Sequence, residues 1–385
     1  MGFEMTDPAA TQDRAPNNES AYLDRVLAEF RLPTEDLAKD LRFFGETLGF
    51  RLDTIYPADN PAVAVMSGHG LRIRLERGAR EAPGTIRLLF PDPAAFAGGR
   101  TELTAPNGTR IEIVDANPPR EMPQTQHALV VRRLEDGDPW IVGRAGMHYR
   151  DLIPGHLGGR IIASHIRIPG GGPVPDMVHY HAVGFQLIFC YLGWVKLVYE
   201  DQGPPFILEA GDCVIQPPEI RHRVLEASEN LEVIEVGVPA EHATTIDHEL
   251  TLPTPARNPD RVFGGQKFCH HRAAEAVWQP WRIAGFETRD TGIADATLGV
   301  ASVQVARRRD RAPEQTTSHR TDILFTFVLE GTMTLRARGR DSQALTTGDA
   351  FVIPPDTRTA YANCSSDLEL LEVSLPGSFE TIIHD

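Results

Sequence analysis

The chain has 385 residues, more than a single hydrophobic core usually organises, so we expect two or three folding units. With 41% hydrophobic and 24% charged residues the composition is globular, and the 30 prolines and 33 glycines favour many turns and short strands. The formal net charge of −15 argues against nucleic acid or an anionic membrane as a partner, because both require a basic face.

The N-terminus and the cysteines bear on the compartment. Residues 1–20 lack the basic and apolar regions of a signal peptide, and no apolar stretch approaches the roughly 20 residues needed to cross a bilayer. The 4 cysteines have no paired spacing of the kind that marks disulfide frameworks or thiolate zinc sites. We therefore expect a cytoplasmic protein with a disordered tail at residues 1–22.

The first patterned segment predicts a small α+β unit. Thr34 is a plausible helix cap, and apolar residues follow at helical spacing until Gly49 ends the pattern; these are Leu37, Leu41, Phe44 and Leu48. Residues 62–76 predict two short strands around a turn at 67–70. Asn107-Gly108, between residues 100–105 and 109–115, predicts a hairpin.

Two stretches of this unit, DLAKDLRFFGETLGFRLDTIYP and LTAPNGTRIEIVDA, resemble the start and end of a glyoxalase and bleomycin-resistance type (vicinal oxygen chelate) domain. The resemblance covers about residues 23–116 of an expected domain at 23–118, although the second half departs from the family pattern. Glu112 stands where the family places a metal-binding glutamate, but the family's other ligands are missing. We interpret Glu112 as an ordinary strand residue and the domain as a structural or dimerising cap, which keeps a homodimer open.

Prolines mark the next two boundaries, which give expected units at 119–252 and 253–385. These two units look like copies of one another, because four markers recur at nearly constant spacing. Arg150-Asp151 recurs after 139 residues as Arg289-Asp290, Gly193 after 138 as Gly331, Gly211-Asp212 after 137 as Gly348-Asp349, and Pro217-Pro218 after 137 as Pro354-Pro355.

The first copy carries a pattern typical of a metal site. Side chains two apart on a strand point to the same face, so His179 and His181 can share one metal ion. A turn can return Gln186 to the same interior, and a second hairpin can bring His222 across. We predict that these four residues bind one divalent metal ion.

The segments GPVPDMVHYHAVGFQLIFCYLGW and GDCVIQPPEIRHRV resemble the two sequence motifs of the cupin superfamily. Gln186 stands where the family usually has a glutamate, and Glu219 where it usually has a glycine. The resemblance implies a mainly β protein with two tandem cupin (jelly-roll) barrels, preceded by the small α+β vicinal-oxygen-chelate-like domain.

The repeat provides a control for the metal prediction. At the ligand positions of the second copy stand Thr317, His319, Leu324 and Thr359. A single histidine cannot hold a metal tightly, so we expect the second barrel to be structural or to offer a pocket for an organic ligand.

Ligand chemistry predicts the kind of substrate. Three neutral imidazoles and an amide leave the 2+ charge uncompensated, which favours a small anionic chelating organic substrate. Imidazole suits several metals, and we favour Fe(II), with Mn, Ni or Zn as alternatives. His165 and Arg167 share one strand face and are the candidate catalytic residues of the pocket, whereas Arg221 and Arg223 should face away from His222.

Three functions remain open. The first is a metal-dependent dioxygenase, since the resemblance implies a superfamily in which many members are dioxygenases. The second is a non-redox isomerase, ring-opening enzyme or cyclase, favoured by Gln186, which resembles the ligand set of cupins that linearise unsaturated uronates. The third is a non-catalytic ligand-binding cupin. The chain carries no DNA-binding motif beside the barrels.

Overall fold

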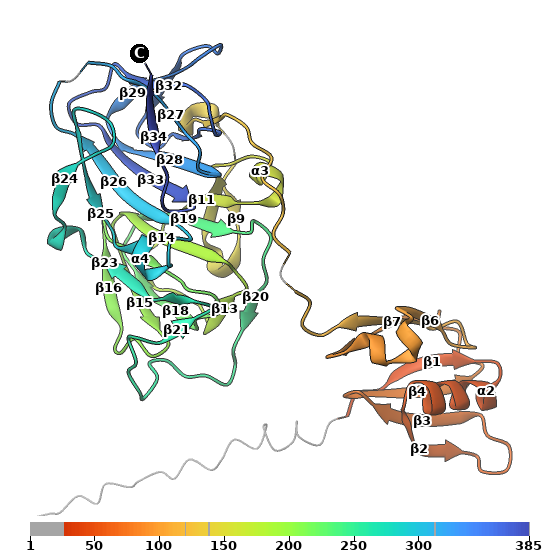
Figure 1. Cartoon of the computed structure of the whole chain (residues 1–385). Coiled ribbons are helices and arrows are strands. Elements are labelled where there is room, and N and C mark those ends of the chain that lie inside the picture. Colours follow the sequence, from red (N-terminus) through yellow and green to blue (C-terminus); the bar gives the residue numbers. More distant parts are fainter. Residues whose placement is uncertain (1–26, 120, 138, 312, 385) are drawn as a thin grey trace, which may run out of the picture. The chain divides into compact units, whose positions relative to one another are not determined.

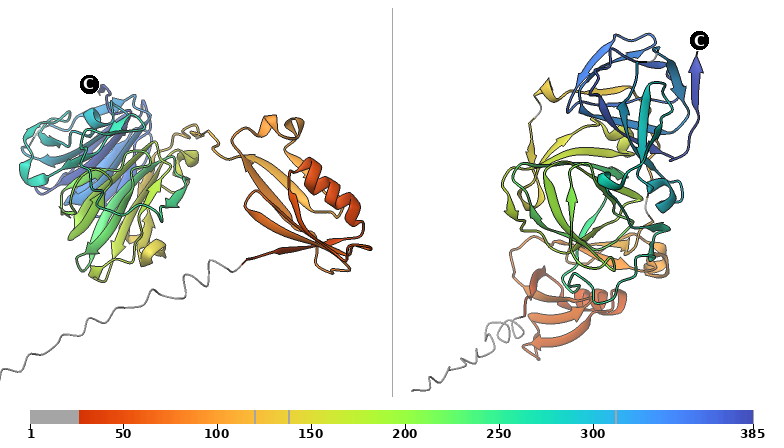
Figure 2. Two further views of the ribbon diagram at one scale, coloured as in Figure 1. Left: turned by 90° about the horizontal axis from the view of Figure 1, so that it is seen from below. Right: turned by 90° about the vertical axis from the view of Figure 1, so that its left-hand side faces the viewer.

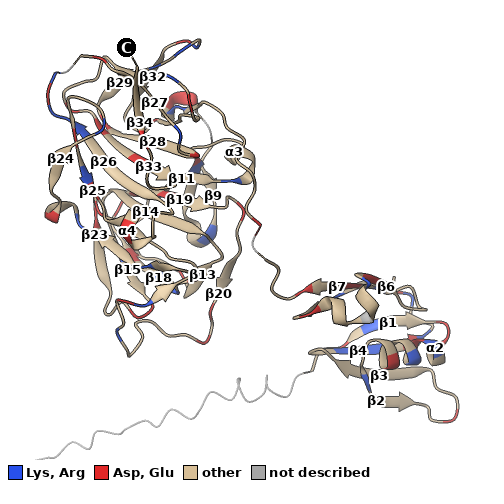
Figure 3. Cartoon of the chain, viewed as in Figure 1, with Lys and Arg blue, Asp and Glu red and all other residues tan. Residues whose placement is uncertain are grey.

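The computed structural model describes residues 27–119, 121–137, 139–311 and 313–384, so the predicted tail at 1–22 lies outside the described residues. The chain divides into two compact units, Met1–Pro119 and Arg120–Asp385. Acidic and basic residues are interspersed in both units in the view of Figure 3. No helix in the described ranges is long and apolar enough to span a membrane.

The N-terminal unit consists of two small sheets and one helix. The first sheet has the order β1-β4-β3-β2 and the second the order β5-β7-β6. In each sheet the strand that comes first in the sequence pairs in parallel with the strand that comes last, β1 with β4 and β5 with β7. Its elements are β1 (Phe30–Thr34), α2 (Leu37–Arg42), the π-helical turn η1 (Phe43–Thr47), β2 (Arg51–Tyr56), β3 (Val63–Gly68), β4 (Leu71–Arg77), β5 (Thr85–Phe90), η2 (Pro93–Ala95), η3 (Ala97–Gly99), β6 (Glu102–Thr104) and β7 (Arg110–Asp115).

Most local predictions for this unit are confirmed. The turn at 67–70 joins β3 to β4, and the Asn107-Gly108 hairpin joins β6 to β7. The predicted cap is wrong: Asp36 caps the helix, accepting a hydrogen bond from the Lys39 amide, whereas Thr34 ends β1 and donates its hydroxyl to the buried Asp40. The glyoxalase-type likeness of the unit stays a prediction.

The second unit contains two barrels, each made of an inner and an outer sheet. In the first barrel the inner sheet has the order β23-β17-β14-β19-β11-β10-β9 and the outer sheet the order β16-β15-β18-β13-β20, with β12 beside β18. The elements are β9 (Ile141–Val142), β10 (His148–Asp151), α3 (His156–Gly159), β11 (Ile162–Ile168), β12 (Gly172–Pro173), β13 (His179–His181), β14 (Phe185–Leu192), β15 (Trp194–Tyr199), β16 (Phe206–Glu209), β17 (Cys213–Ile215), β18 (His222–Ala227), β19 (Leu231–Val238), β20 (Thr244–Ile246) and β23 (Cys269–His271).

The second barrel repeats this arrangement in its described residues, except for a counterpart of β12. Its inner sheet has the order β8-β31-β28-β33-β26-β25-β24 and its outer sheet the order β30-β29-β32-β27-β34. The elements are β8 (Val130–Arg132), β24 (Trp278–Pro280), β25 (Phe286–Asp290), α4 (Ile293–Ala296), β26 (Ser302–Arg308), β27 (Thr316–His319), β28 (Ile323–Glu330), β29 (Thr332–Ala337), β30 (Gln343–Thr346), β31 (Ala350–Val352), β32 (Thr359–Ala362), β33 (Glu369–Leu375) and β34 (Thr381–His384). The hairpin β21 (Val262–Phe263) and β22 (Gln266–Lys267) and the short turns η4 (Leu134–Asp136), η5 (Arg144–Gly146) and η6 (Ala273–Glu275) complete the unit.

The barrels exchange one edge strand. β8 precedes the first barrel in sequence but pairs with β31 of the second, and β23 begins the second copy but pairs with β17 of the first. Each inner sheet is therefore completed by a strand from the other half of the duplication. Because of this exchange, no single boundary in the sequence divides the chain into the two barrels.

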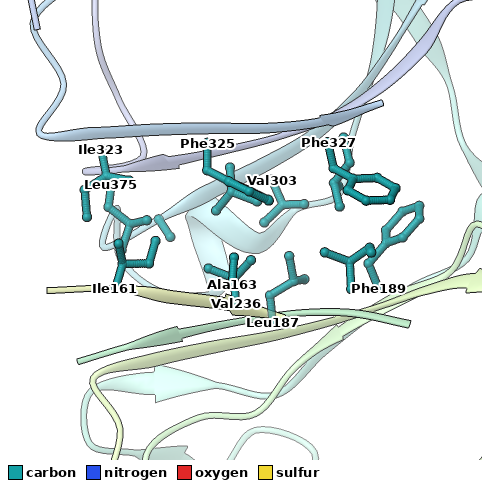
Figure 4. Packing of buried hydrophobic residues seen from close by; sticks show 14 of the residues in the cluster. Ile161, Ala163, Leu187, Phe189, Val236, Val303, Ile323, Phe325, Phe327 and Leu375 are labelled. Carbon is teal, nitrogen blue, oxygen red and sulfur yellow. The ribbon is translucent and has the colours of Figure 1, made fainter. Parts of the chain in front are cut away.

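The two inner sheets pack face to face and share one hydrophobic core (Figures 1 and 2). Figure 4 shows side chains from both sheets meeting across the layer. The labelled residues are Ile161, Ala163, Leu187, Phe189 and Val236 from the first barrel, and Val303, Ile323, Phe325, Phe327 and Leu375 from the second. Because one face of each inner sheet is buried in this core, its other face is left to line the barrel interior.

Two buried arginines connect the barrels reciprocally. Arg150 donates a hydrogen bond to the carbonyl of Gly348, and Arg289 donates one of 2.9 Å to the carbonyl of Gly211. Both glycines have a φ of +89°, and a Cβ at Gly348 would lie 2.9 Å from Leu134. The Arg-Asp and Gly-Asp markers of the repeat are thus the two halves of an inter-barrel contact.

The reciprocal contact predicts a stability effect. Arg289 is buried and also donates to His271 at 3.0 Å, so Arg289→Ala leaves two half-buried acceptors without this donor and should lower the free energy of unfolding by about 2–3 kcal/mol. The exposed Arg309, changed to Ala, should alter it by less than about 0.5 kcal/mol. Urea unfolding of both variants measures the difference. Equal stabilities would contradict the importance of the contact.

Candidate metal centre

Three histidines meet inside the first barrel as predicted. His179 and His181 lie two apart on β13, and β18 places His222 directly opposite His179. All three are buried, and their ligand atoms lie within 4.8 Å of one another. Among the described residues, this is the one group of three or more His, Cys, Asp or Glu side chains with ligand atoms that converge in this way.

Hydrogen bonds orient the three rings. His179 Nδ1 lies 2.7 Å from the Met177 carbonyl and His222 Nδ1 lies 2.9 Å from the Ile220 carbonyl. Because a carbonyl can only accept, both Nδ1 atoms carry the proton and both Nε2 atoms keep a lone pair for a metal. His181 Nδ1 is 2.8 Å from the hydroxyl of Thr244, which can play the same part.

The surroundings keep these rings neutral. Burial lowers the pKa of His179, lowers that of His181 to about 3, and holds that of His222 well below its ordinary value. The neighbouring imidazoles lower the pKa of His181 and His222 further, since two adjacent cations repel. Neutral imidazoles are the form that binds a metal, so the site needs no deprotonation step at neutral pH.

Gln186 projects toward the same interior. Its neighbours Phe185 and Leu187 on β14 point into the shared core, so alternation turns Gln186 to the opposite face. Its amide Nε2 donates to Glu235, while its buried Oε1 has no hydrogen-bond partner among the described residues. A buried amide oxygen without a partner on the interior face of β14 suits a metal ligand, and the three imidazoles fit a bound divalent ion.

The predicted place of His165 and Arg167 in the metal pocket is wrong. On β11 the residues that line the cavity are Ser164 and the isoleucines, so the residues between them point to the other barrel. His165 accepts from Arg150 and donates from Nε2 to Glu232 at 2.6 Å. Arg167 binds the same carboxylate at 2.8 Å. The strand alternation was predicted correctly, but the wrong face was assigned to the pocket.

These two residues belong to a polar cluster between the barrels. Arg167 stacks 4.5 Å from the centre of the Trp140 ring, and His165 contacts Phe327 of the second barrel edge to face. Burial lowers the pKa of His165, which keeps its ring neutral. The cluster therefore holds β11 and β19 on the face that packs against the other barrel. The opposite face of these two strands lines the cavity.

A cavity of about 320 Å³ opens beside the triad. Its walls are mainly aliphatic, and they include Met147, Ile162, Ile166, Ile168, Ile188, Val195, Leu197, Val224, Leu231 and Val233. The polar lining residues that sequence reasoning missed include Arg144, Tyr149, Gln216, Glu235 and His242. Two of them carried a signal, because Arg144 and Glu235 recur in the second copy after 138 and 137 residues as Arg282 and Glu372.

At the corresponding place the second barrel has a cavity of about 590 Å³, whose lining includes Arg282, Glu372 and Phe379. Leu324 packs in an apolar cluster, and His319 Nε2 lies 3.1 Å from the Ile353 carbonyl, which turns that nitrogen into a donor. Arg282 forms a two-pronged pair with Glu372 and stacks 4.6 Å from the centre of the Trp281 ring. Arg282, Glu372 and Trp281 therefore line this cavity, where the first barrel has Arg144, Glu235 and the triad beside its own cavity.

Comparison with known proteins identifies the architecture. A family model described as a cupin domain matches residues 309–374, and the salicylate 1,2-dioxygenase of Pseudaminobacter salicylatoxidans is similar with a TM-score of 0.51 and 16% identity over 69% of this chain and 91% of that chain. The two barrels are cupin barrels. A mutant form of the oxalate decarboxylase of Bacillus subtilis is also similar, with a TM-score of 0.48 and 12% identity over 69% of this chain and 80% of that chain.

The predicted fold class, a mainly β protein with tandem cupin barrels, is confirmed. At this low identity the structural likeness shows the fold alone. A search of curated proteins found no match to the chain. The cupin family model matches the second barrel, whereas the converging histidines lie in the first.

The contrast between the cupin barrels predicts metal content. His181→Ala removes one of three imidazoles and should abolish metal retention, whereas His319→Ala should leave it unchanged. Mass-spectrometric metal analysis of protein purified without a histidine tag gives the ion content per chain. Stoichiometric metal in His181→Ala, or its loss in His319→Ala, would place the ion elsewhere.

Proposed function

We propose that the chain is a metal-dependent cupin enzyme of the dioxygenase type, acting on a small anionic chelating substrate with an apolar body. The observation that carries the proposal is the convergence of three histidine lone pairs beside an aliphatic cavity. His179, His181, His222 and Gln186 would hold the ion, with Fe(II) favoured and Mn, Ni or Zn as alternatives.

The charge of the site supports an anionic substrate. Four neutral ligands leave the ion's 2+ charge uncompensated, and Arg144 adds a cation to the cavity wall. A bound Fe(II) ion supplies redox chemistry that brings a chelated organic anion and O₂ together. The chain's own residues supply the binding surface, the orientation of the imidazoles and the exclusion of water.

The cavity wall supports an apolar substrate body. Ten aliphatic or thioether side chains in the cavity lining offer no hydrogen bonds to a polyhydroxylated substrate such as a sugar acid. Buried hydroxyl groups without partners cost free energy, so a hydroxylated or keto acid with a hydrocarbon body fits better. This feature weighs against the uronate-like substrates implied by Gln186.

A non-redox reaction is the second candidate, and two side chains favour it. Glu235 and His242 line the cavity beside the triad, where they can transfer protons to or from a metal-bound carbonyl compound. Burial raises the pKa of Glu235, which brings this carboxyl closer to the range useful for acid and base catalysis.

Metal substitution separates the two candidates. We expect Fe(II)-loaded protein to consume O₂ with 2-hydroxybenzoate, mandelate or a phenyl-substituted 1,3-diketone, but not with gluconate, when an oxygen electrode monitors the reaction. Zn(II)-loaded protein should be inactive because zinc has no redox chemistry. Turnover by the Zn(II) form without O₂ would establish the non-redox reaction instead. Binding without turnover by either form would indicate a ligand-binding cupin.

Gln186 provides a test of substrate charge. Gln186→Glu adds an anionic ligand but places it against Glu235, so the two carboxyls should share a proton that metal binding releases. Metal should be retained, while an anionic substrate should bind more weakly by about 1–4 kcal/mol, the Coulomb range at contact distance. Titration calorimetry in buffers of different ionisation enthalpy measures both effects. Tighter substrate binding in this variant would indicate a neutral or cationic substrate.

A further inference from the structure

Arg144 contacts Nε2 of His179, the nitrogen through which this histidine would bind a metal ion. Its Nη2 lies 3.0 Å from His179 Nε2, and its Nη1 binds Asp176. His179 Nδ1 donates to the Met177 carbonyl, so Nε2 has no proton and accepts from the arginine. The same lone pair cannot accept a proton donor and ligate a cation at once. Arginine and metal are therefore alternative partners of His179.

Arg144 and its partner Asp176 differ in exposure. Asp176 has only 1% of its side chain exposed and is fixed by a hydrogen bond of 2.9 Å from the Val224 amide. The Arg144 side chain is 36% exposed and extends from the turn η5 into the cavity wall. When an ion takes His179 Nε2, the guanidinium is the partner that can move.

The second barrel shows the arginine without histidine partners. Arg282, at the position equivalent to Arg144, binds both oxygens of Glu372. In the first barrel the equivalent carboxylate, Glu235, accepts instead from Gln186. Unlike Arg282, Arg144 therefore binds no carboxylate of the cavity wall. It is also the one Lys or Arg in the cavity lining of the described residues.

We propose that Arg144 couples metal binding to carboxylate binding in the first barrel, an inference that rests on the metal centre of the proposed function. The guanidinium and the metal compete for His179 Nε2, and the displaced guanidinium binds the carboxylate of a ligand in the cavity. A carboxylate that draws Arg144 away from His179 raises metal affinity, and by linkage the metal raises carboxylate affinity by the same factor.

The coupling is measurable in the unaltered protein. Titration calorimetry with Mn(II) is performed with and without cyclohexanecarboxylate, an apolar monocarboxylate that has no second chelating group. We expect the carboxylate to tighten Mn(II) binding about 5- to 50-fold, within the usual range of coupling between two sites. An unchanged Mn(II) affinity would overturn the proposal.

Arg144→Gln distinguishes coupling through the arginine from direct binding of the carboxylate to the metal. Without carboxylate this variant should bind Mn(II) several-fold more tightly than the parent, because the competing donor and its charge are gone. Added cyclohexanecarboxylate should then have little effect. Mn(II) binding no tighter than in the parent, or coupling of the same size, would refute the role of Arg144.

Two further variants control for charge and folding. Arg223→Gln removes an exposed cation next to His222 in sequence, on the outward face of β18, and should behave as the parent. Arg144→Lys keeps the charge but cannot reach Asp176 and His179 with one fork, so it should bind Mn(II) more tightly than the parent and keep part of the coupling. If the parent does not bind Mn(II), the metal centre itself is rejected. If the parent binds Mn(II) and Arg144→Gln binds it equally well, only the role of Arg144 is rejected.

Discussion

The reciprocal contact between the barrels is the constraint on which the metal centre depends. Each inner sheet receives an edge strand from the other half of the chain. The buried Arg150 and Arg289 donate hydrogen bonds to the carbonyls of Gly348 and Gly211 in the opposite barrel. With one face of each inner sheet fixed in a shared core, the other face is held at a defined distance from the outer sheet that carries the histidines. The cavity is therefore a consequence of how the duplicated halves pack.

Strand alternation gives each inner strand two functions. On β11, Ala163 faces the core and Ser164 the cavity, and on β14 the same alternation separates Leu187 from Gln186. His165 is a polar residue on the core side, and its hydrogen bonds to Arg150 and Glu232 offset the cost of burying all three. A substitution at the barrel interface can thus alter the metal pocket without contacting it, because both faces share one backbone.

The sequence allowed the triad to be predicted because its geometry is local. His179 and His181 follow from the two-residue repeat of a strand, and His222 follows from the cupin motif. The face assigned to His165 could not be predicted in this way, since both faces of the inner sheet are covered and the alternation of His165 and Arg167 with isoleucines does not say which face lines the cavity. The exchange of β8 and β23 also escaped prediction: each has 3 residues, and their partners are set by long-range packing.

The two copies differ in the residues that could hold a metal ion. Both copies retain an arginine and a glutamate at equivalent places, Arg144 with Glu235 and Arg282 with Glu372. In the second barrel Leu324 stands at the position of Gln186, so Glu372 has no amide donor there and binds the arginine. In the first barrel Gln186 donates to Glu235, and Arg144 donates to His179. The same two charges are therefore paired with each other in the second barrel and with other residues in the first, where we propose that a cation and an anion bind together.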